Sequence, residues 1–349
     1  MKINHKKVSS PKGEINIYEI VNEKGASVVL SSLGAGIVAV NVPDAAGKIE
    51  NVALGYAEPA DYFYDGPCAG KTPGRYANRI ARGRFSIDGH EYTLAVNNGP
   101  NALHGGPEGF QNRLWESRTE GYDTVVFTRV SPDGEEGYPG NLDVEVRYTW
   151  SEDNRLVIDY RAVTDKATVV NLTNHTYWNL RGESAGNALD HHLKLYCSRY
   201  LPTDDTLVPT GEMDAVAGTP MDFTTAHAVG DNIKADFPAL VYGKGYDNCW
   251  LIDGHEAGKL SSAASLYSPA SGRRLDVYTT QPAAQVYTGN WLEGCPKSIS
   301  GGEYHDYDGI AIECQACPDA PNKPAFPSTI LRPGEVYSQK IVYAFSINK

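Results

Sequence analysis

A single glutamate in an apolar stretch is the residue of this sequence best suited to act as a general base. Segment 309–315 reads Gly-Ile-Ala-Ile-Glu-Cys-Gln, so Glu313 has no charged neighbour in the chain. If the segment is a strand, Ile310, Ile312 and Cys314 face the core and Glu313 faces the opposite side. Burial would raise the pKa of this carboxyl toward the range useful for proton abstraction. A structural salt bridge is the alternative role for Glu313.

Segment 171–180 places an imidazole, a phenol and an amide at alternating positions. It reads Asn-Leu-Thr-Asn-His-Thr-Tyr-Trp-Asn-Leu, and a regular strand would put His175, Tyr177 and Asn179 on one face. Such a face is unusual for a packed core. It suits the floor of a polar cleft for a polyhydroxylated ligand, with the aromatic ring against the C–H face of a sugar.

Two further candidates for ligand binding lie between residues 74 and 106. Arg79 stands beside Asn78 among Ala and Ile, and a packed guanidinium there could offer a fork of donors to hydroxyl groups. A structural ion pair is the alternative. His104 precedes two glycines, which allow a ligand or the backbone to approach closely. Most histidines are neither catalytic residues nor ligands, so a structural role also stays open for His104.

A third polar face is predicted for residues 278–287. A regular strand would place Gln281, Gln285 and Tyr287 on one side, and amide side chains suit sugar hydroxyls because they both donate and accept hydrogen bonds. Pro282 interrupts the pattern, because proline cannot donate to a sheet ladder.

Two patterns that resemble metal sites are not interpreted as such. Cys314 and Cys317 have the spacing of a redox or zinc motif, but Pro318 follows and no second cysteine pair is present. The pair His191 and His192 lacks a third ligand at a recognisable spacing. We therefore expect no metal site and six reduced cysteines.

The elements that must position these residues are predicted to be strands. Thirty-five glycines and 21 prolines leave few stretches long enough for a helix. Residues 142–150 and 156–162 alternate with period two around the turn residues 152–154, which predicts a β-hairpin. Other strands are expected near 13–21, 26–31, 36–42, 123–130, 167–178, 246–252, 274–281, 284–288, 309–315 and 336–346. Many strands without intervening helices predict an all-β fold of packed antiparallel sheets. No linker or repeat divides the chain, so one domain over 1–349 is expected.

Composition excludes several classes of partner. The formal net charge is −12, and no run of basic residues is long enough to attract phosphate backbones or anionic lipid. No apolar run approaches the length of a membrane-spanning helix. The basic N-terminus is not followed by the apolar core of a signal peptide, so the cytoplasm is the expected location.

Seven short segments, taken in order along nearly the whole chain, resemble the aldose 1-epimerase (galactose mutarotase) family. They are Gly74-Arg-Tyr-Ala-Asn-Arg-Ile80, Leu103-His-Gly-Gly106, Asn171-Leu-Thr-Asn-His-Thr-Tyr177, Pro209-Thr-Gly211, Thr279-Thr-Gln-Pro282, Tyr287-Thr-Gly-Asn290 and Pro318-Asp-Ala-Pro-Asn322. Each segment alone is a weak signal. Their shared order makes the resemblance specific.

The resemblance implies a large antiparallel β-sandwich (a galactose mutarotase-like supersandwich) with an open sugar cleft and no metal or organic cofactor. It implies that the enzyme interconverts the α and β anomers of a free hexose such as D-galactose or D-glucose. In that reaction Glu313 would be the general base at the anomeric hydroxyl and His175 the general acid at the ring oxygen. The expected sugar-binding residues are Asn78, Arg79, His104, Tyr177, Asp247 and Gln285, with Gln285 preferred to Gln281.

Two departures from the family pattern leave the preferred sugar open. Asn248 follows Asp247 where many members have His, and Thr224 stands where Arg is common. An epimerase of a hexose 6-phosphate would need additional cations for the phosphate, and no such cluster is recognisable. A carbohydrate-binding domain without catalysis would not need both His175 and Glu313. A glycosidase could use Glu313 and Asp247 as its two carboxylates. The protein is expected to be a monomer or a homodimer that binds a small aldose.

Overall fold

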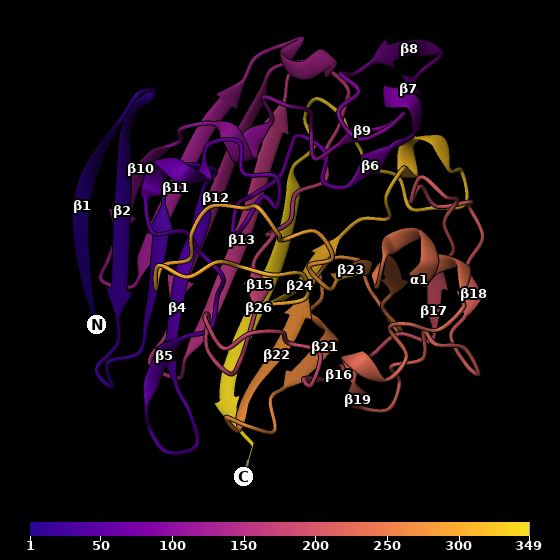
Figure 1. The fold of residues 1–349 in the computed structure, drawn as a ribbon. Coiled ribbons are helices and arrows are strands. Elements are labelled where there is room, and N and C mark those ends of the chain that lie inside the picture. The colour runs from indigo at the N-terminus through magenta and orange to yellow at the C-terminus, as the bar shows by residue number, and fades with distance from the viewer. Residues whose placement is uncertain (349) are drawn as a thin grey trace.

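The computed structural model describes residues 1–348, and almost all of its regular structure is β-strand (Figure 1). Every pairing between named strands of the described chain is antiparallel. The strands form three large sheets and three pairs. The prediction of a large antiparallel β-sandwich is confirmed.

The largest sheet has nine strands, in the order β10 (Glu116–Glu120), β11 (Thr124–Ser131), β12 (Leu142–Trp150), β13 (Arg155–Thr164), β26 (Tyr337–Ile347), β22 (Arg273–Thr279), β21 (Ser261–Tyr267), β16 (His192–Leu195) and β19 (His227–Ala228). A six-stranded sheet has the order β15 (Tyr177–Trp178), β24 (Ile310–Gln315), β23 (Ala283–Tyr287), β20 (Asp247–Leu251), β17 (Arg199–Leu201) and β18 (Asp214–Ala215). A five-stranded sheet contains β1 (Lys2–Ser10), β2 (Gly13–Val21), β3 (Ser27–Ser31), β4 (Gly36–Pro43) and β5 (Ile49–Asn51).

The remaining elements are short. The three strand pairs are β6 (Arg79–Ile80) with β9 (Ala102–Leu103), β7 (Arg84–Ile87) with β8 (His90–Thr93), and β14 (Thr168–Val169) with β25 (Ile330–Leu331). The helices are α1 (Pro238–Gly243) and the 3-10 turns η1 (Pro59–Tyr62), η2 (Ala81–Gly83), η3 (Phe110–Asn112), η4 (Glu135–Gly137), η5 (Val229–Asp231) and η6 (Ala320–Asn322). No helix among residues 1–348 has both the length and the apolar character needed to cross a membrane.

The main hydrophobic core joins the three large sheets. It contains Val28 of β3, Val146 of β12 and Ile312 of β24, all of them fully buried. In β12 the alternate residues from Leu142 to Trp150 are buried, because successive side chains of a strand point to opposite faces. The sheets are therefore held together by the apolar side chains that stand at alternate positions of their strands.

Most predicted strands are present, including the hairpin of β12 and β13, whose register pairs Leu142 with Thr164 and Trp150 with Leu156. The strand predicted over 167–178 is wrong, because only Thr168–Val169 and Tyr177–Trp178 are strand there. The separate strands predicted near 274–281 and 284–288 are present as β22 and β23, and the chain leaves regular strand between Thr279 and Ala283, around Pro282.

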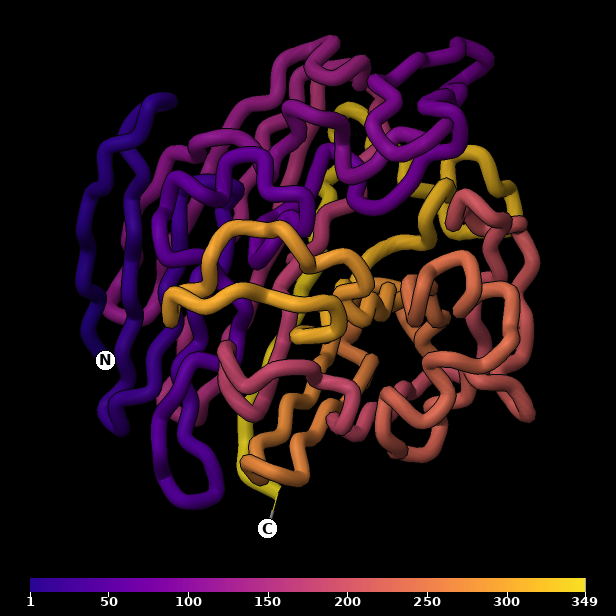
Figure 2. The backbone as a smooth tube through the Cα atoms, in the orientation of Figure 1, coloured from indigo at the N-terminus to yellow at the C-terminus, as the bar shows by residue number. Residues whose placement is uncertain are grey.

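The segment between β23 and β24 crosses the front of the molecule toward the N-terminal strands, as the orange tube of Figure 2 shows. The Ile299 N–H donates to the Gly55 carbonyl, and Ser298 forms an isolated bridge with Tyr56. This crossing brings residues 297–299 against residues 55–57, which are far apart in the sequence.

Candidate active site

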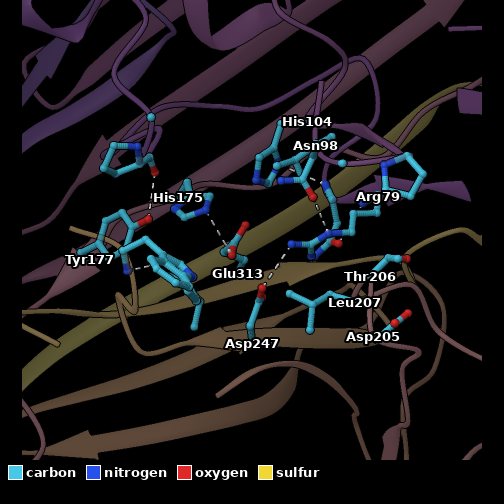
Figure 3. A pocket seen from close by; sticks show the side chains of 18 residues that line it. Arg79, Asn98, His104, His175, Tyr177, Asp205, Thr206, Leu207, Asp247 and Glu313 are labelled. Atoms are coloured by element: carbon cyan, nitrogen blue, oxygen red, sulfur yellow. Dashed lines mark hydrogen bonds and ion pairs between the residues drawn. The ribbon is translucent and has the colours of Figure 1, made fainter. Parts of the chain in front are cut away.

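A pocket of about 560 Å³ opens beside β24 and collects most of the predicted site residues (Figure 3). Seven of the eight predicted residues line it: Asn78, Arg79, His104, His175, Tyr177, Asp247 and Glu313. The other lining residues are Gly66, Pro67, Asn98, Gly99, Pro100, Leu103, Asp205, Thr206, Leu207, Tyr287 and Trp291. Its volume lies in the range typical of small-molecule sites.

Glu313 lies in the middle of β24, where register with β23 fixes its position. It pairs with Gln285 across the strands, while its neighbours Ile312 and Cys314 point into the main core as predicted. The carboxyl is 2% exposed, and its Oε2 atom has no hydrogen-bond partner in the described chain. Burial raises the pKa of Glu313 well above its usual value, the negative charge of Asp247 raises it further, and only the Arg79 guanidinium opposes these effects.

His175 faces Glu313 but is not part of a strand. Its Nε2 atom lies 3.5 Å from Oε1 of Glu313, as the dashed line in Figure 3 marks. Residues 171–175 form backbone hydrogen bonds with residues 71–77 in an irregular pairing, which is why the predicted strand is absent. The ring is 5% exposed, and burial lowers the pKa of His175 to about 4 despite the nearby negative charge of Asp247.

The loss of the regular strand changes the predicted polar face. His175 and Tyr177 line the pocket, but Asn179 does not. The Asn179 amide instead donates to the carbonyls of Gly186 and Asp308, at 2.6 and 2.9 Å. Asn179 therefore supports the backbone, and only two of the three residues predicted to share this face reach the pocket.

His104 is held in one tautomer by a backbone hydrogen bond. The Asn78 N–H donates to Nδ1 of His104 at 3.1 Å, so the proton of the neutral ring lies on Nε2. Burial lowers the pKa of His104 well below its usual value, and the charges of His175 and Arg79 lower it further. His104 is therefore a neutral hydrogen-bond donor through Nε2. Gly105 follows because a Cβ at that position would lie 1.9 Å from the Gly74 carbonyl oxygen.

Arg79 and Asp247 form the polar wall beside the base. Their Nη2 and Oδ2 atoms are 3.3 Å apart, and both side chains are only slightly exposed. The Arg79 Nε donates to Oδ1 of Asn98 at 3.0 Å, and the Asn78 Oδ1 accepts the Arg79 backbone N–H at 2.8 Å. The side-chain hydrogen bonds hold the guanidinium in a fixed orientation, with donors left for a hydroxylated ligand.

Neither glutamine lines the pocket. Gln285 lies next to it and donates from Nε2 to Oδ1 of Asp247 at 2.6 Å, so it orients a residue of the wall. Gln281 is fully engaged elsewhere, since its Nε2 donates to the Leu172 carbonyl and the Tyr337 hydroxyl, both at 3.1 Å. This geometry favours Gln285 over Gln281, and a direct contact of Gln285 with sugar stays a prediction.

Several lining residues were not predicted from the sequence. Asn98 lies in an Asn-Asn-Gly-Pro turn, and residues 205–207 come from the loop between β17 and β18. Trp291 directly follows one of the family-like segments and is 65% exposed, which is unusual for so large an apolar ring. Its exposure was the only property that could have marked it, and exposure is not readable from sequence.

The two departures from the family pattern lie outside the pocket lining. Asn248 is buried on β20, and Thr224 is exposed and hydrogen-bonded to Asp222 at 2.5 Å through its hydroxyl. Neither side chain therefore alters the wall of the pocket.

One group of described residues has the composition of a metal site, namely His104, His175 and Glu313, whose potential ligand atoms lie within 4.8 Å of one another. The hydrogen bond to Nδ1 of His104 keeps the proton on the Nε2 atom, which would have to be deprotonated to bind a metal. The donor set therefore does not fit a metal ion. The six cysteines are all free. The Leu180 N–H donates a hydrogen bond to Nε2 of His191 at 2.8 Å.

Comparisons with known proteins agree with this geometry. The family model described as aldose 1-epimerase matches residues 16–344. Human galactose mutarotase is 44% identical over 320 residues, which cover 92% of this chain and 91% of that protein. Aldose 1-epimerase of Escherichia coli (strain K12) is 39% identical over 346 residues, 98% of this chain and 99% of that protein. The crystal structure of galactose 1-epimerase from Lactobacillus acidophilus NCFM superposes with a TM-score of 0.87 at 30% identity, covering all of both chains. The chain therefore belongs to the aldose 1-epimerase family.

Proposed function

We propose that this protein interconverts the α and β anomers of a free hexose, with Glu313 as general base and His175 as general acid. The observation that carries the proposal is the approach of the His175 Nε2 to within 3.5 Å of a buried, otherwise unpaired carboxylate. Relatives of this chain are named galactose mutarotase and aldose 1-epimerase. D-galactose and D-glucose are the substrates to test first.

Each group has one task in the ring opening. Glu313 takes the proton of the anomeric hydroxyl while His175 gives a proton to the ring oxygen, and the bond between C1 and that oxygen breaks. The product is an open-chain aldehyde. Rotation about the bond between C1 and C2 presents the other face of the carbonyl, and the same two groups run the closure in reverse to form the other anomer.

The two groups share one proton throughout this cycle. The closed sugar faces a Glu313 carboxylate and a protonated His175, and the open aldehyde faces a protonated Glu313 and a neutral His175. Burial raises the pKa of Glu313 and lowers that of His175, so the dry pocket stabilises the uncharged pair that faces the aldehyde. The pair titrates as a unit because the two groups are in contact.

The surrounding residues supply contacts for the sugar. The Nε2–H of His104 is a permanent donor to an oxygen of the ring. Arg79 and Asp247 offer donors and acceptors to hydroxyls, with Asn98 holding the Arg79 guanidinium and Gln285 holding the Asp247 carboxylate. The Tyr177 hydroxyl donates to the Pro67 carbonyl at 2.9 Å, which leaves its ring as an apolar surface in the pocket.

The pocket favours a free hexose over the alternatives. Arg79 is the one Lys or Arg residue among the described lining residues, and Asp247 already pairs with it, so no cluster of cations awaits a phosphate. Both oxygens of Asp247 are hydrogen-bonded, to Arg79 and Gln285, which suits a fixed hydroxyl acceptor better than the second carboxylate of a glycosidase.

Polarimetry tests the proposal directly. Freshly dissolved α-D-galactose or α-D-glucose should relax to its usual final rotation faster when catalytic amounts of the protein are present. An unchanged relaxation rate with both sugars would reject a mutarotase of free hexoses, and acceleration with a hexose 6-phosphate alone would favour that alternative.

We also propose that residues 1–349 act as one domain in the cytoplasm. The main core supports a single domain, because it extends from Tyr18 of β2 to Phe345 of β26. The six free cysteines support a reducing compartment. The choice between monomer and homodimer stays a prediction, which sedimentation would decide.

A further inference from the structure

A buried lysine lies behind the pocket, outside its lining. The Lys71 side chain is 1% exposed, and its ammonium group pairs with the Asp65 carboxylate, which is completely buried. The same Nζ donates to the Tyr62 carbonyl at 2.7 Å and to Oδ1 of Asn112 at 3.2 Å. These three contacts use the full donor capacity of an ammonium group.

The other Asp65 oxygen ties the same loop together. Oδ2 of Asp65 accepts a hydrogen bond from the Tyr56 hydroxyl at 3.1 Å and another from the Ala69 N–H at 2.8 Å. The Lys71–Asp65 pair therefore fixes both ends of segment 65–71 against the body of the protein.

The main chain of this segment is what holds the proposed acid. The His175 N–H donates to the Lys71 carbonyl and the Gly70 N–H donates to the His175 carbonyl, both at 2.9 Å. The Asn174 side chain donates to the Gly70 carbonyl at 2.8 Å, and the Tyr177 hydroxyl donates to the Pro67 carbonyl at 2.9 Å. Segment 65–71 thus contacts the irregular segment around His175 on both sides of the histidine.

His175 depends on this support because its own ring has little. Nδ1 of His175 is buried without a hydrogen-bond partner in the described chain, and no sheet ladder fixes its backbone. We propose that Lys71, paired with Asp65, is a positioning residue that holds His175 against Glu313 through the main chain of residues 70–71. The inference rests on the proposed function, since it concerns the proposed acid of that reaction.

If the Lys71–Asp65 pair served only to stabilise the fold, an apolar pair could replace it equally well. Burying two charges costs desolvation energy, and replacing a buried ion pair by uncharged groups is often neutral or stabilising. The charge of Lys71 also reaches the site, because it lowers the pKa of both His175 and His104, although less than burial does. Substitution of Lys71 should therefore change catalysis in ways that a loss of stability alone does not.

The decisive variants are Lys71→Met and the charge-balanced double variant Asp65→Asn with Lys71→Met. We expect kcat for mutarotation to fall about 10-fold or more in both, with KM changed less than about 2-fold, because the sugar contacts stay in place. Arg273→Met is the matched control. Arg273 is also 1% exposed and pairs with Glu50 at 3.2 Å, but its guanidinium donates to the carbonyls of Val42 and Leu180, neither of which lines the pocket. It should lose stability and keep its kcat.

The pH profile separates positioning from structure. The groups that face His175 are Glu313, Asp247, His104, Tyr177 and Tyr287, together with the Lys71 charge behind it. Without the Lys71 charge the pKa of His175 should rise, so in Lys71→Met the limb of the kcat/KM profile that His175 sets should shift toward alkaline pH. The double variant also loses the opposite charge of Asp65, so its profile should shift less. The profile of Arg273→Met should stay in place.

The outcomes are distinguishable. Wild-type protein without mutarotase activity would reject the proposed function and this inference with it. Active wild-type protein, together with a folded double variant that keeps wild-type kcat, would reject the positioning role of Lys71 alone. If neither Lys71 variant folds, Asn112→Ala removes a single acceptor of Nζ, and a kcat indistinguishable from wild type would then overturn the inference.

Discussion

The two groups of the proposed acid–base pair are held by different kinds of structure. Glu313 lies on β24, where the register with β23 pairs it with Gln285 and leaves its side chain no choice of face. His175 lies on an irregular segment whose backbone bonds go to residues 71–77. The base is thus positioned by a sheet and the acid by a loop, and errors in the loop are expected to cost catalysis before they cost the fold.

The largest expected effect is the loss of the base. Glu313→Gln keeps the shape of the side chain and removes the proton acceptor, so kcat should fall about 10³- to 10⁴-fold with little change in KM. Stopped-flow polarimetry of α-D-galactose would measure it. Glu183→Gln is the matched control, because Glu183 is also a buried carboxylate but is hydrogen-bonded to Tyr304 at 2.7 Å outside the pocket. A turnover of Glu313→Gln close to wild type would remove Glu313 from the mechanism.

Loss of the acid should cost somewhat less. His175→Asn removes the proton donor while Nε2 of His104 remains as a hydrogen-bond donor, so we expect kcat to fall about 10²- to 10³-fold. His191→Asn is a control of similar burial outside the pocket lining, since His191 is completely buried and accepts a hydrogen bond from the Leu180 N–H. Equal activities of the two variants would contradict the assignment of His175.

Damage to the loop should affect the acid without touching a side chain of the pocket. In Gly70→Ala the new Cβ would lie 1.9 Å from the Ile37 carbonyl oxygen, at a residue with φ of +72°. The segment must shift, so we expect a loss of about 2–4 kcal/mol in the free energy of unfolding and a kcat lowered about 10-fold. Denaturant unfolding and polarimetry measure the two effects.

The contrasting strand variant is Ala284→Gly in β23. It loosens a fully buried position next to Gln285 and should cost about 1 kcal/mol or more with kcat unchanged within about 2-fold. If Gly70→Ala and Ala284→Gly lowered kcat by the same factor per kcal/mol of lost stability, the proposed difference between the loop that holds His175 and the sheet that holds Glu313 would be disproved.

The smallest expected effects are opposite pH dependences of stability. The pKa of Glu313 is raised in the folded protein, so the stability it contributes is complete below its unfolded pKa near 4.5 and is lost as pH rises. Glu313→Gln lacks this loss and should be more stable than wild type at pH 8, a gain often seen when an active-site charge is removed.

His175 should show the reverse. Its pKa is lowered from 6.5 to about 4, so its contribution is complete above pH 6.5 and is lost as pH falls toward 4. His175→Asn should therefore gain on wild type between pH 6.5 and 4, by at most about 3 kcal/mol. Thermal unfolding across pH 4–9 measures both variants, and parallel curves for the two would show that the pKa shifts are absent.

The sequence predicted the regular part of this molecule well. Period-two alternation located β12, β13 and β24 and placed Glu313 on the face opposite Ile312. It failed where the backbone bonds of a segment go to a loop, because residues 171–176 have the composition of a strand but pair irregularly with 71–77. Alternation along such a segment does not predict which way each side chain points. The prediction that Asn179 shares the polar face of His175 and Tyr177 was wrong for this reason.

By itself, the sequence determined the strand-rich architecture, the family and seven of the residues that line the pocket. These follow from local patterns and from short segments that need no knowledge of long-range contacts. Tertiary structure alone decided the tautomer of His104, the choice of Gln285 as the partner of Asp247, and the burial of Lys71 behind His175. Each of these depends on a hydrogen bond or ion pair between segments that the chain brings together only when the sheets pack.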